Sequence, residues 1–395
     1  MRKLTYILFI LLILGLGSCT TSAPVLEKIP DVSVEPIGPI KPPEQAEADE
    51  NIFQSERDYV TIIAVGDNLF HLAMIQDGEE GDYISAYEEI RHLVEQADIA
   101  FINQETLLAG KDFGLSGYPR FNTPQEVGRA IAATGFNIVN HATNHIMDKG
   151  VEAVFATMDL WDTMPEVQIL GIHRNEEQRK LPVLVTKNNI TIGFLSYTYG
   201  TNAIPLPKDK PYLVSLINTE IMKEEITNLR PLCDFLLVSM HWGNEYRHNY
   251  NKDQETLAAF LAENMVDLVI GHHPHAIQPV EYIKRPDDST MLCFYSLGNF
   301  ISSQIQNVTL LGAMAYIKIA KDNGIEITEA GAIPLVTHYE YNHRNIKVYP
   351  LYSYTQELLE KHWRKDRDNG LSMDYFTGLA STVFEHREIK SNPFQ

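Results

Sequence analysis

Cysteine is scarce in this chain of 395 residues. There are three cysteines, Cys19, Cys233 and Cys293, and no Cys-x-x-Cys pair. A zinc site built from such thiolate pairs is therefore excluded. Cys233 and Cys293 each lie within an apolar run, which leaves two interpretations. They form a disulfide, as an exported protein allows, or they are buried free thiols on neighbouring strands, which the apolar surroundings favour.

Basic residues are also few. Lysine and arginine number 32 against 52 aspartates and glutamates, and the formal net charge is −20. Binding to nucleic acid normally requires a basic patch that neutralises phosphates, so we expect no nucleic-acid partner. A bare polyanion is disfavoured as a ligand for the same reason, unless metal ions or a local basic site intervene.

The apolar stretch at the N-terminus, from Leu4 to Leu16, is too short to span a bilayer. Two basic residues precede it and Gly17-Ser18-Cys19 follow it. This pattern predicts a secretory signal over residues 1–18, and small residues before a cysteine resemble the lipobox of bacterial lipoproteins, in which Cys19 would be lipidated. The alternative is an uncleaved helical anchor in which Cys19 is incidental. Either way we expect an exported protein, held by its anchor at the cell membrane or outer membrane and facing the envelope or the outside.

Residues 19–58 are rich in proline and acidic residues and contain no aromatic residue before Phe53. Such a segment cannot bury enough apolar surface to offset its ordering entropy, so it predicts an extended tether. We expect one large domain over residues 59–352, followed by a helical C-terminal extension over residues 353–395.

Apolar runs alternate with amphipathic segments through most of the large domain. The runs have the length of strands and are apolar on both faces, which is typical of a sheet covered on both sides in a layered α/β fold. Towards residue 350 the pattern changes to antiparallel strands, which predicts a β-rich part. Two helices have clearer limits: one opens at Thr123-Pro124, with Thr123 as its cap, and another runs through the sequence QELLEKHWRKDRDNG after residue 355.

Polar clusters stand where five of the predicted strands end. They are GDN (66–68), NQE (103–105), NHATNH (140–145), HWGNE (241–245) and GHHPH (271–275). Apolar strands need no such ends for stability, whereas carboxylate, amide oxygen and imidazole together are ligands for a divalent metal ion. The clusters therefore predict a metal-dependent site on one rim of the sheet system.

These clusters, together with SLGNF (296–300), occur in the order found in the CapA-type proteins of poly-γ-glutamate capsule biosynthesis, and the chain resembles that family over roughly residues 60–350. The family resembles the calcineurin-like metallophosphoesterases. The resemblance implies a four-layer α/β/β/α sandwich with two divalent ions at strand ends; mixed nitrogen and oxygen ligands suit Mn, Fe and Zn alike.

The resemblance also implies roles for individual residues. Asp67 and His275 would bind the first metal, and Glu105 would bridge both metals. The second metal would be held by residues from three clusters: Asn144, His241 and His273.

His145 is expected to act as a general acid or to stabilise the transition state, with Asp148 fixing its tautomer. Asn103 and Asn140 are expected to satisfy loop backbone groups.

One departure stands out, because metallophosphoesterases carry Asp-x-His where this chain has Asp67-Asn68-Leu69. The first metal thus lacks an imidazole, unless His71, His141 or His272 replaces it.

Two functions remain open. The chain is either an exported hydrolase, acting on a phosphoester or on an amide or ester of an anionic envelope polymer, or a non-catalytic platform that contacts subunits of a polymer synthase or exporter.

Overall fold

The computed structural model describes residues 58–395, apart from 80–81, 322–323, 366 and 368–369. The predicted signal over residues 1–18, the lipidation site Cys19 and all but the last residue of the tether lie outside the described residues. In the part of the chain that is described, no helix is both long and apolar enough to cross a membrane.

The first sheet has the strand order β14-β13-β12-β1-β2-β3-β4, and β11 pairs with β1 in parallel. Strands β1 to β4 are parallel to one another, whereas β12, β13 and β14 add the antiparallel part that the sequence predicts. The strands of this sheet are β1 (Tyr59–Leu69), β2 (Ile99–Gln104), β3 (Ile138–Asn140), β4 (Gln168–Leu170), β11 (Asn299–Ser302), β12 (Leu311–Lys321), β13 (Ile325–Glu340) and β14 (Arg344–Pro350).

The second sheet has the order β5-β6-β7-β8-β10-β9. Its central strands β6, β7, β8 and β10 are parallel, and antiparallel strands form both edges. The strands are β5 (Val183–Lys187), β6 (Ile190–Thr198), β7 (Phe235–His241), β8 (Leu268–His272), β9 (Val280–Lys284) and β10 (Thr290–Phe294).

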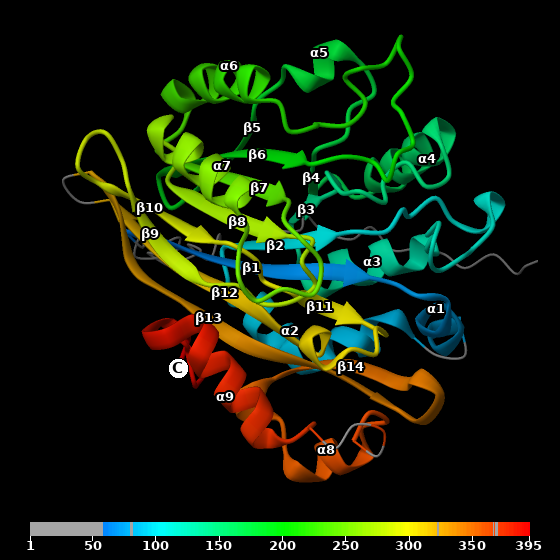
Figure 1. Ribbon diagram of the computed structural model, residues 1–395. Helices are drawn as coiled ribbons and strands as arrows, with labels where there is room; N and C mark the ends of the chain where they lie inside the picture. The colour runs from blue at the N-terminus through cyan, green and yellow to red at the C-terminus, as the bar shows by residue number, and fades with distance from the viewer. Residues whose placement is uncertain (1–57, 80–81, 322–323, 366, 368–369) are drawn as a thin grey trace, which may run out of the picture. The chain divides into compact units, whose positions relative to one another are not determined.

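The two sheets share a hydrophobic core, and helices cover their outer faces (Figure 1). Strand β7 shows how the alternation of side chains builds these layers. Leu237 packs in the core common to both sheets, whereas its neighbours Leu236 and Val238 pack with residues of α6 and α7 on the other face. The four-layer α/β/β/α sandwich expected from the sequence is thereby confirmed.

The helices lie mostly in the connections between strands. Residues of α2 and α3 pack in the core of the first sheet, and the C-terminal helix α9 packs there as well. The helices are α1 (Leu72–Glu79), α2 (Glu88–Val94), α3 (Gln125–Thr134), α4 (Val151–Trp161), α5 (Glu176–Arg179), α6 (Thr219–Leu229), α7 (Lys252–Glu263), α8 (Gln356–Lys361) and α9 (Met373–Phe384).

The C-terminal extension is helical, as expected, but α8 is much shorter than the sequence indicated. It ends at Lys361, and His362 adopts extended backbone angles. The His362 ring then contacts the backbone oxygen of Thr337 in β13, at 3.1 Å, and is buried there. Tertiary burial of this ring, rather than the local helix propensity, determines where α8 stops.

Two local expectations were wrong. The residue before α3 is Pro124, and the hydroxyl of Thr123 donates to that of Thr106 instead of capping the helix. Cys233 and Cys293 are free thiols, as favoured, but only Cys293 lies in a strand.

Gly66 allows β1 to approach the loop before β11 very closely. A Cβ atom at Gly66 would lie 1.9 Å from the carbonyl oxygen of Gly298, which itself has a φ of +64°. The same oxygen accepts a hydrogen bond from the backbone N–H of Asp67, at 2.9 Å. The backbone at Gly66 therefore fixes the position of the first predicted metal ligand.

We predict that Gly66→Ala lowers the free energy of unfolding by roughly 3 kcal/mol, because neither backbone can move without breaking strand pairing. Chemical denaturation measures this change. Gly378→Ala is the matched control, since its Cβ in α9 meets no atom within 4 Å and alanine is the better helix former. Equal stability of the two variants would contradict the prediction.

Candidate metal centre

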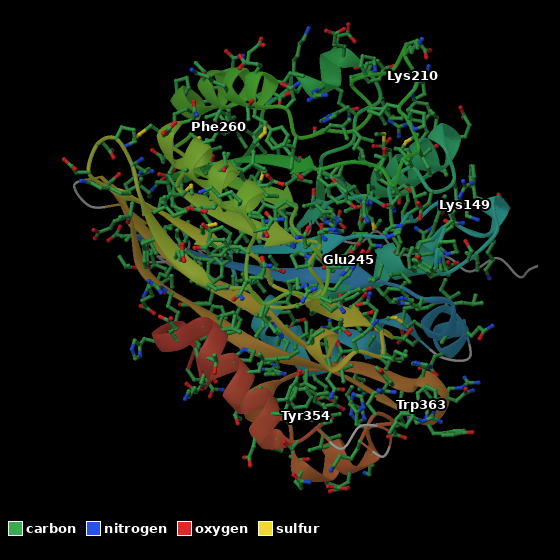
Figure 2. The ribbon with its side chains drawn as sticks, in the orientation of Figure 1. Lys149, Lys210, Glu245, Phe260, Tyr354 and Trp363 are labelled. Carbon is green, nitrogen blue, oxygen red and sulfur yellow. The ribbon has the colours of Figure 1, made fainter. Side chains whose placement is uncertain are left out.

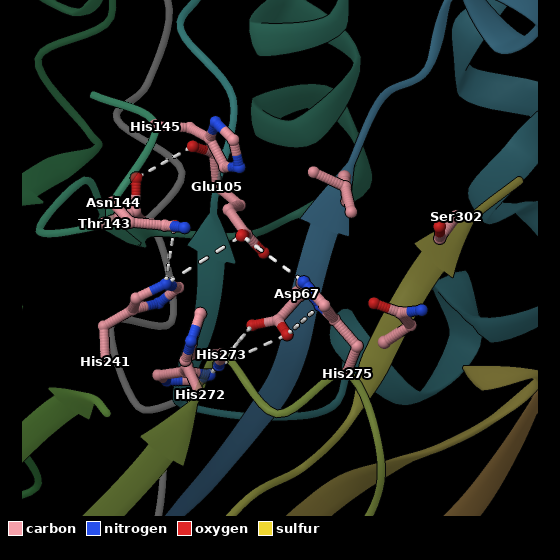
Figure 3. A network of polar contacts seen from close by, with 12 residues as sticks. Asp67, Glu105, Thr143, Asn144, His145, His241, His272, His273, His275 and Ser302 are labelled. Carbon is pink, nitrogen blue, oxygen red and sulfur yellow. Dashed lines mark hydrogen bonds and ion pairs between the residues drawn. The ribbon is translucent and has the colours of Figure 1, made fainter. Parts of the chain in front are cut away.

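Strand ends from both sheets meet at one buried site (Figure 3). Asp67 comes from the end of β1 and Glu105 follows β2, both in the first sheet. His241 ends β7, and the loop after β8 brings His273 and His275 from the second sheet. All five side chains are buried, so the clusters predicted to share one rim do lie together.

The first group consists of Asp67, Glu105 and His275, whose potential ligand atoms all lie within 4.8 Å of one another. Nδ1 of His275 lies 2.9 Å from Asp67 Oδ2, and its Nε2 lies 3.8 Å from Glu105 Oε1. Burial alone would lower the pKa of His275, but the carboxylates of Glu105 and Asp67 outweigh it and raise that pKa to about 9. A positive charge is therefore stabilised at this position, which a metal ion would supply with release of the proton.

The second group consists of Glu105, His241 and His273, again within 4.8 Å. Nε2 of His241 lies 3.9 Å from Glu105 Oε1 and 3.0 Å from the amide oxygen of Asn144. Burial is the main cause that lowers the pKa of His241 well below its usual value, and it lowers that of His273 to about 3. Both imidazoles are thus neutral near pH 7, the state that binds a metal.

The residues fit divalent ions because their buried polar atoms lack other partners. Neither carboxylate oxygen of Glu105 has a hydrogen-bond partner among the described residues, nor does Nδ1 of His241 or of His273. Burial, together with the neighbouring Asp67 carboxylate, raises the pKa of Glu105 well above its ordinary value. A buried carboxylate without a hydrogen bond is costly, and bound cations would remove this cost. Glu105 belongs to both groups, which is the geometry of a bridging ligand.

A chain of amides holds Asp67 in place. Nδ2 of Asn103 donates to Asp67 Oδ1 at 2.8 Å, and Nδ2 of Asn140 donates to Asn103 Oδ1 at 2.6 Å. The hydroxyl of Ser196, in the second sheet, donates to Asn140 Oδ1. Asn140 also satisfies a loop backbone group as expected, because its Oδ1 accepts the N–H of Ala142 at 3.0 Å. Asn103, in contrast, bonds to side chains.

The loop that carries His273 and His275 has an unusual backbone. Both residues have positive φ values, 95° and 55°, on either side of Pro274. The N–H of His273 also lies 3.3 Å from each carboxylate oxygen of Asp67. Non-glycine residues adopt this conformation only where the surroundings impose it, and such residues are common at functional sites.

His145 and Asp148 form the pair predicted from their spacing. Nδ1 of His145 donates to Asp148 Oδ2 at 2.7 Å, and the same oxygen accepts the backbone N–H of Phe121 at 2.7 Å. The Phe121 ring meets the imidazole edge-on at 4.7 Å. Asp148 therefore fixes the tautomer and leaves Nε2 of His145 without the proton in the neutral ring.

The missing imidazole beside Asp67 is not supplied by His71 or His141. Nδ1 of His71 lies 3.2 Å from the backbone oxygen of Leu69, and Nε2 of His141 accepts a hydrogen bond from the Trp161 indole at 2.7 Å. His272 is the extra imidazole that lies close, with Nδ1 3.8 Å from Asp67 Oδ1. Neither of its ring nitrogens has a hydrogen-bond partner in the described chain.

Asn68 follows Asp67 in the motif that lacks the expected imidazole, and its side chain also bonds to other residues. Its amide nitrogen donates to Gln104 at 2.5 Å, and its oxygen accepts from the Tyr87 hydroxyl at 3.1 Å.

Comparison with known proteins identifies the family. Residues 61–304 match the family described as "Bacterial capsule synthesis protein PGA_cap". The chain belongs to this family. Relatives include the capsule biosynthesis protein CapA of Bacillus anthracis, 25% identical over 74% of this chain and 71% of the relative, and the PGA biosynthesis protein CapA of Bacillus subtilis (strain 168), 28% identical over 54% and 57%.

Solved structures similar to this capsule-family member include a hypothetical protein from Thermus thermophilus, with a TM-score of 0.44 at 12% identity, covering 69% of this chain and 98% of the other. A 5'-nucleotidase precursor from the same organism has a TM-score of 0.43 at 11% identity, and the match covers 70% of this chain and 54% of the nucleotidase chain.

Three residues near the centre had no predicted role. Glu245 forms a further potential ligand group with His273 and His275, although it is exposed. Asn202 bonds to the Asn144 amide at 3.1 Å and lies 3.1 Å from Nδ1 of His145. The ring of Tyr199 packs against that of His273, with centroids 4.7 Å apart. Glu245 belongs to the HWGNE cluster, so the sequence contained a signal for it. Asn202 and Tyr199 lie in a loop without a motif.

We predict that Asn103→Ala lowers the affinity for Mn²⁺ or Zn²⁺ by about ten- to a hundredfold, because Asp67 loses the amide that orients it. Calorimetric titration of the metal measures this. Asn137→Ala is the control: that amide also bonds near β2, to Ala100 N at 3.0 Å, but not to any predicted ligand. Unchanged affinity in Asn103→Ala would contradict a positioning role.

Proposed function

We propose that this member of the capsule family is a metal-dependent hydrolase, exported and anchored to a membrane through Cys19, that acts during capsule polymer production. One observation carries the proposal: the buried Glu105 carboxylate belongs to two potential ligand groups and has no hydrogen-bond partner among the described residues. A purely structural carboxylate in such a place would be expected to have hydrogen bonds.

The proposed ligand set is the one that the resemblance implies. Asp67, Glu105 and His275 would hold one divalent ion, with His272 close by. Glu105 would also hold the other ion, together with the remaining second-group residues Asn144, His241 and His273. When bound, two such ions would supply Lewis-acid chemistry and activate water; Mn, Fe and Zn all suit this set of nitrogen and oxygen ligands.

A side chain of the protein would donate the proton that the leaving group takes up. Asp148 holds the His145 ring through Nδ1, and a protonated Nε2 could then donate to the departing oxygen or nitrogen as a general acid. Phe121 packs against the same ring and limits its rotation.

The substrate proposed is a phosphoester, or an amide or ester bond of an anionic envelope polymer. The net charge of −20 would repel such a substrate, so bound cations are needed at the point of attack. The names of the two Bacillus relatives, which concern capsule and PGA biosynthesis, favour a polymer of the poly-γ-glutamate type.

A second candidate function is a non-catalytic platform for subunits of a polymer synthase or exporter. The engagement of Asn68 with Gln104 and Tyr87 favours it, because the first metal then has fewer ligands than the metallophosphoesterase pattern provides. A weakly held first metal would leave the fold intact but would abolish hydrolysis.

We predict that the purified protein contains Mn, Fe or Zn, and that a His273→Ala/His275→Ala double variant loses it, because both ligand groups lose an imidazole. Metal analysis by mass spectrometry tests this. The absence of these metals from the wild-type protein would overturn the hydrolase.

His145→Asn separates chemistry from metal binding in the same experiment. We expect it to retain the metals but to hydrolyse a chromogenic phosphodiester or a γ-glutamyl polymer about a hundredfold more slowly, since the proton donor is lost. The exposed His92→Asn is the matched control. If His145→Asn and the wild type are equally active, His145 has no catalytic role.

We predict that Cys19→Ser moves the protein from the membrane to the soluble fraction outside the cytoplasm, because a serine cannot carry the thioether-linked lipid. Fractionation followed by immunoblotting measures this, with Cys233→Ser as the control. Membrane retention of Cys19→Ser would favour an uncleaved helical anchor instead.

A further inference from the structure

A second polar group, which includes buried atoms without hydrogen-bond partners, lies in the C-terminal extension. It consists of Trp363, Arg364 and Arg367, in the turn after α8, and we call it the basic cluster (Figure 2 labels Trp363). The Arg367 guanidinium lies 4.3 Å from the centre of the Trp363 ring, and His343, before β14, meets that ring edge-on at 4.4 Å. Two elements far apart in the chain thus build this surface together.

Several donors of the basic cluster have no acceptor. Nε1 of Trp363 and Nε of Arg364 are buried without a hydrogen-bond partner in the described part of the chain, and so is Nε2 of the neighbouring His343. Buried N–H groups are nearly always paired, with protein, water or a ligand. This exception therefore points to an acceptor that lies outside the described residues.

The two arginines also lack carboxylate partners. Arg364 and Arg367 form no ion pair with any described residue, whereas the nearby Lys361 pairs with Glu357 at 2.8 Å and Lys347 pairs with Glu89 at 3.3 Å. Acidic residues outnumber basic ones 52 to 32 in this protein, so most cations find an internal partner easily. Two arginines of one turn without such a partner among the described residues provide the local basic site that an anionic polymer would require.

A short series of contacts connects the basic cluster to the metal centre. The ring of Tyr339 lies 4.9 Å from that of His343, and its hydroxyl donates to the backbone oxygen of Gln304 at 2.9 Å. The side chain of Gln304 donates to the Tyr246 hydroxyl at 3.4 Å, and the Tyr246 ring lies 6.0 Å from that of His275. Three residues therefore span from one site to the other.

We propose that Trp363, Arg364 and Arg367 bind the carboxylates of an anionic polymer chain at a position separate from the metal centre. A guanidinium group matches a carboxylate with two parallel hydrogen bonds, and the Trp363 ring packs against the guanidinium of Arg367. The choice of a carboxylate polymer rests on the proposed function, whereas the anion site itself rests on the unpartnered donors. Such a site would keep the polymer on the protein while a different part of it lies at the metal centre.

Trp363 provides the readout. The chain has three tryptophans, and the other two, Trp161 and Trp242, are each only 2% exposed. The full-length protein is titrated with a short γ-linked glutamate oligomer in the presence of a metal chelator, and the tryptophan fluorescence is followed. We expect a saturable change, and an affinity that falls as salt is raised, because the contact is ionic.

The variant that tests the site is Arg364→Gln/Arg367→Gln. We expect its affinity for the oligomer to fall at least about tenfold, since two charge-assisted contacts are lost. Arg91→Gln/Arg174→Gln is the matched control, because it removes the same two charges from residues that pair with acids elsewhere on the surface. We expect less than a twofold change there.

Three results would overturn the basic cluster as a polymer site: no binding by the wild type, equal loss in both double variants, or no loss in either. Inorganic phosphate is titrated in parallel. Tighter binding of phosphate than of the oligomer would also contradict a carboxylate polymer. The chelator removes metals, so oligomer binding is measured separately from hydrolysis. If the oligomer binds but no hydrolysis is found, only the proposed hydrolase function is contradicted.

Discussion

The structure depends on one costly feature, a buried carboxylate without a hydrogen-bond partner. Glu105 lies between an aspartate-histidine group and a pair of neutral imidazoles, and it is delivered by the end of β2 at the junction of two sheets. Nothing in strand pairing requires a charge at this position. Burial raises the pKa of Glu105 well above its ordinary value. Without cations its carboxyl group therefore favours the protonated form, whereas a metal ligand must be negatively charged. The proposed metal ions would resolve this conflict.

The surrounding chain keeps the ligands in place at some further cost. Gly66 lets two backbones approach within a distance that no side chain permits, and His273 and His275 adopt positive φ values around Pro274. The amides of Asn103 and Asn140 in the first sheet align Asp67, and the hydroxyl of Ser196 in the second sheet bonds to Asn140. Each feature orients a predicted ligand instead of filling space. This is the arrangement expected when stability is exchanged for a preorganised site.

Much of this could be predicted from the sequence, because strand ends and polar clusters are local signals. The parallel strands, the layered fold and the meeting of Asp67, Glu105, His241, His273 and His275 follow from apolar runs that end in ligand-type residues. Asn202 and Tyr199 could not be found this way, since their loop carries no motif and only tertiary folding brings them to His145 and His273. The early end of α8 was missed for a similar reason: His362 is buried against β13, which the helical pattern does not reveal.

The central claim is that Glu105 bridges two metal ions. Anomalous diffraction from crystals grown with Mn²⁺ tests it most directly, because each bound ion gives its own peak. The account predicts two peaks about 4 Å apart, one beside Asp67 and His275 and the other beside His241 and His273, with Glu105 between them. A single peak, or two peaks that do not share Glu105, would contradict it.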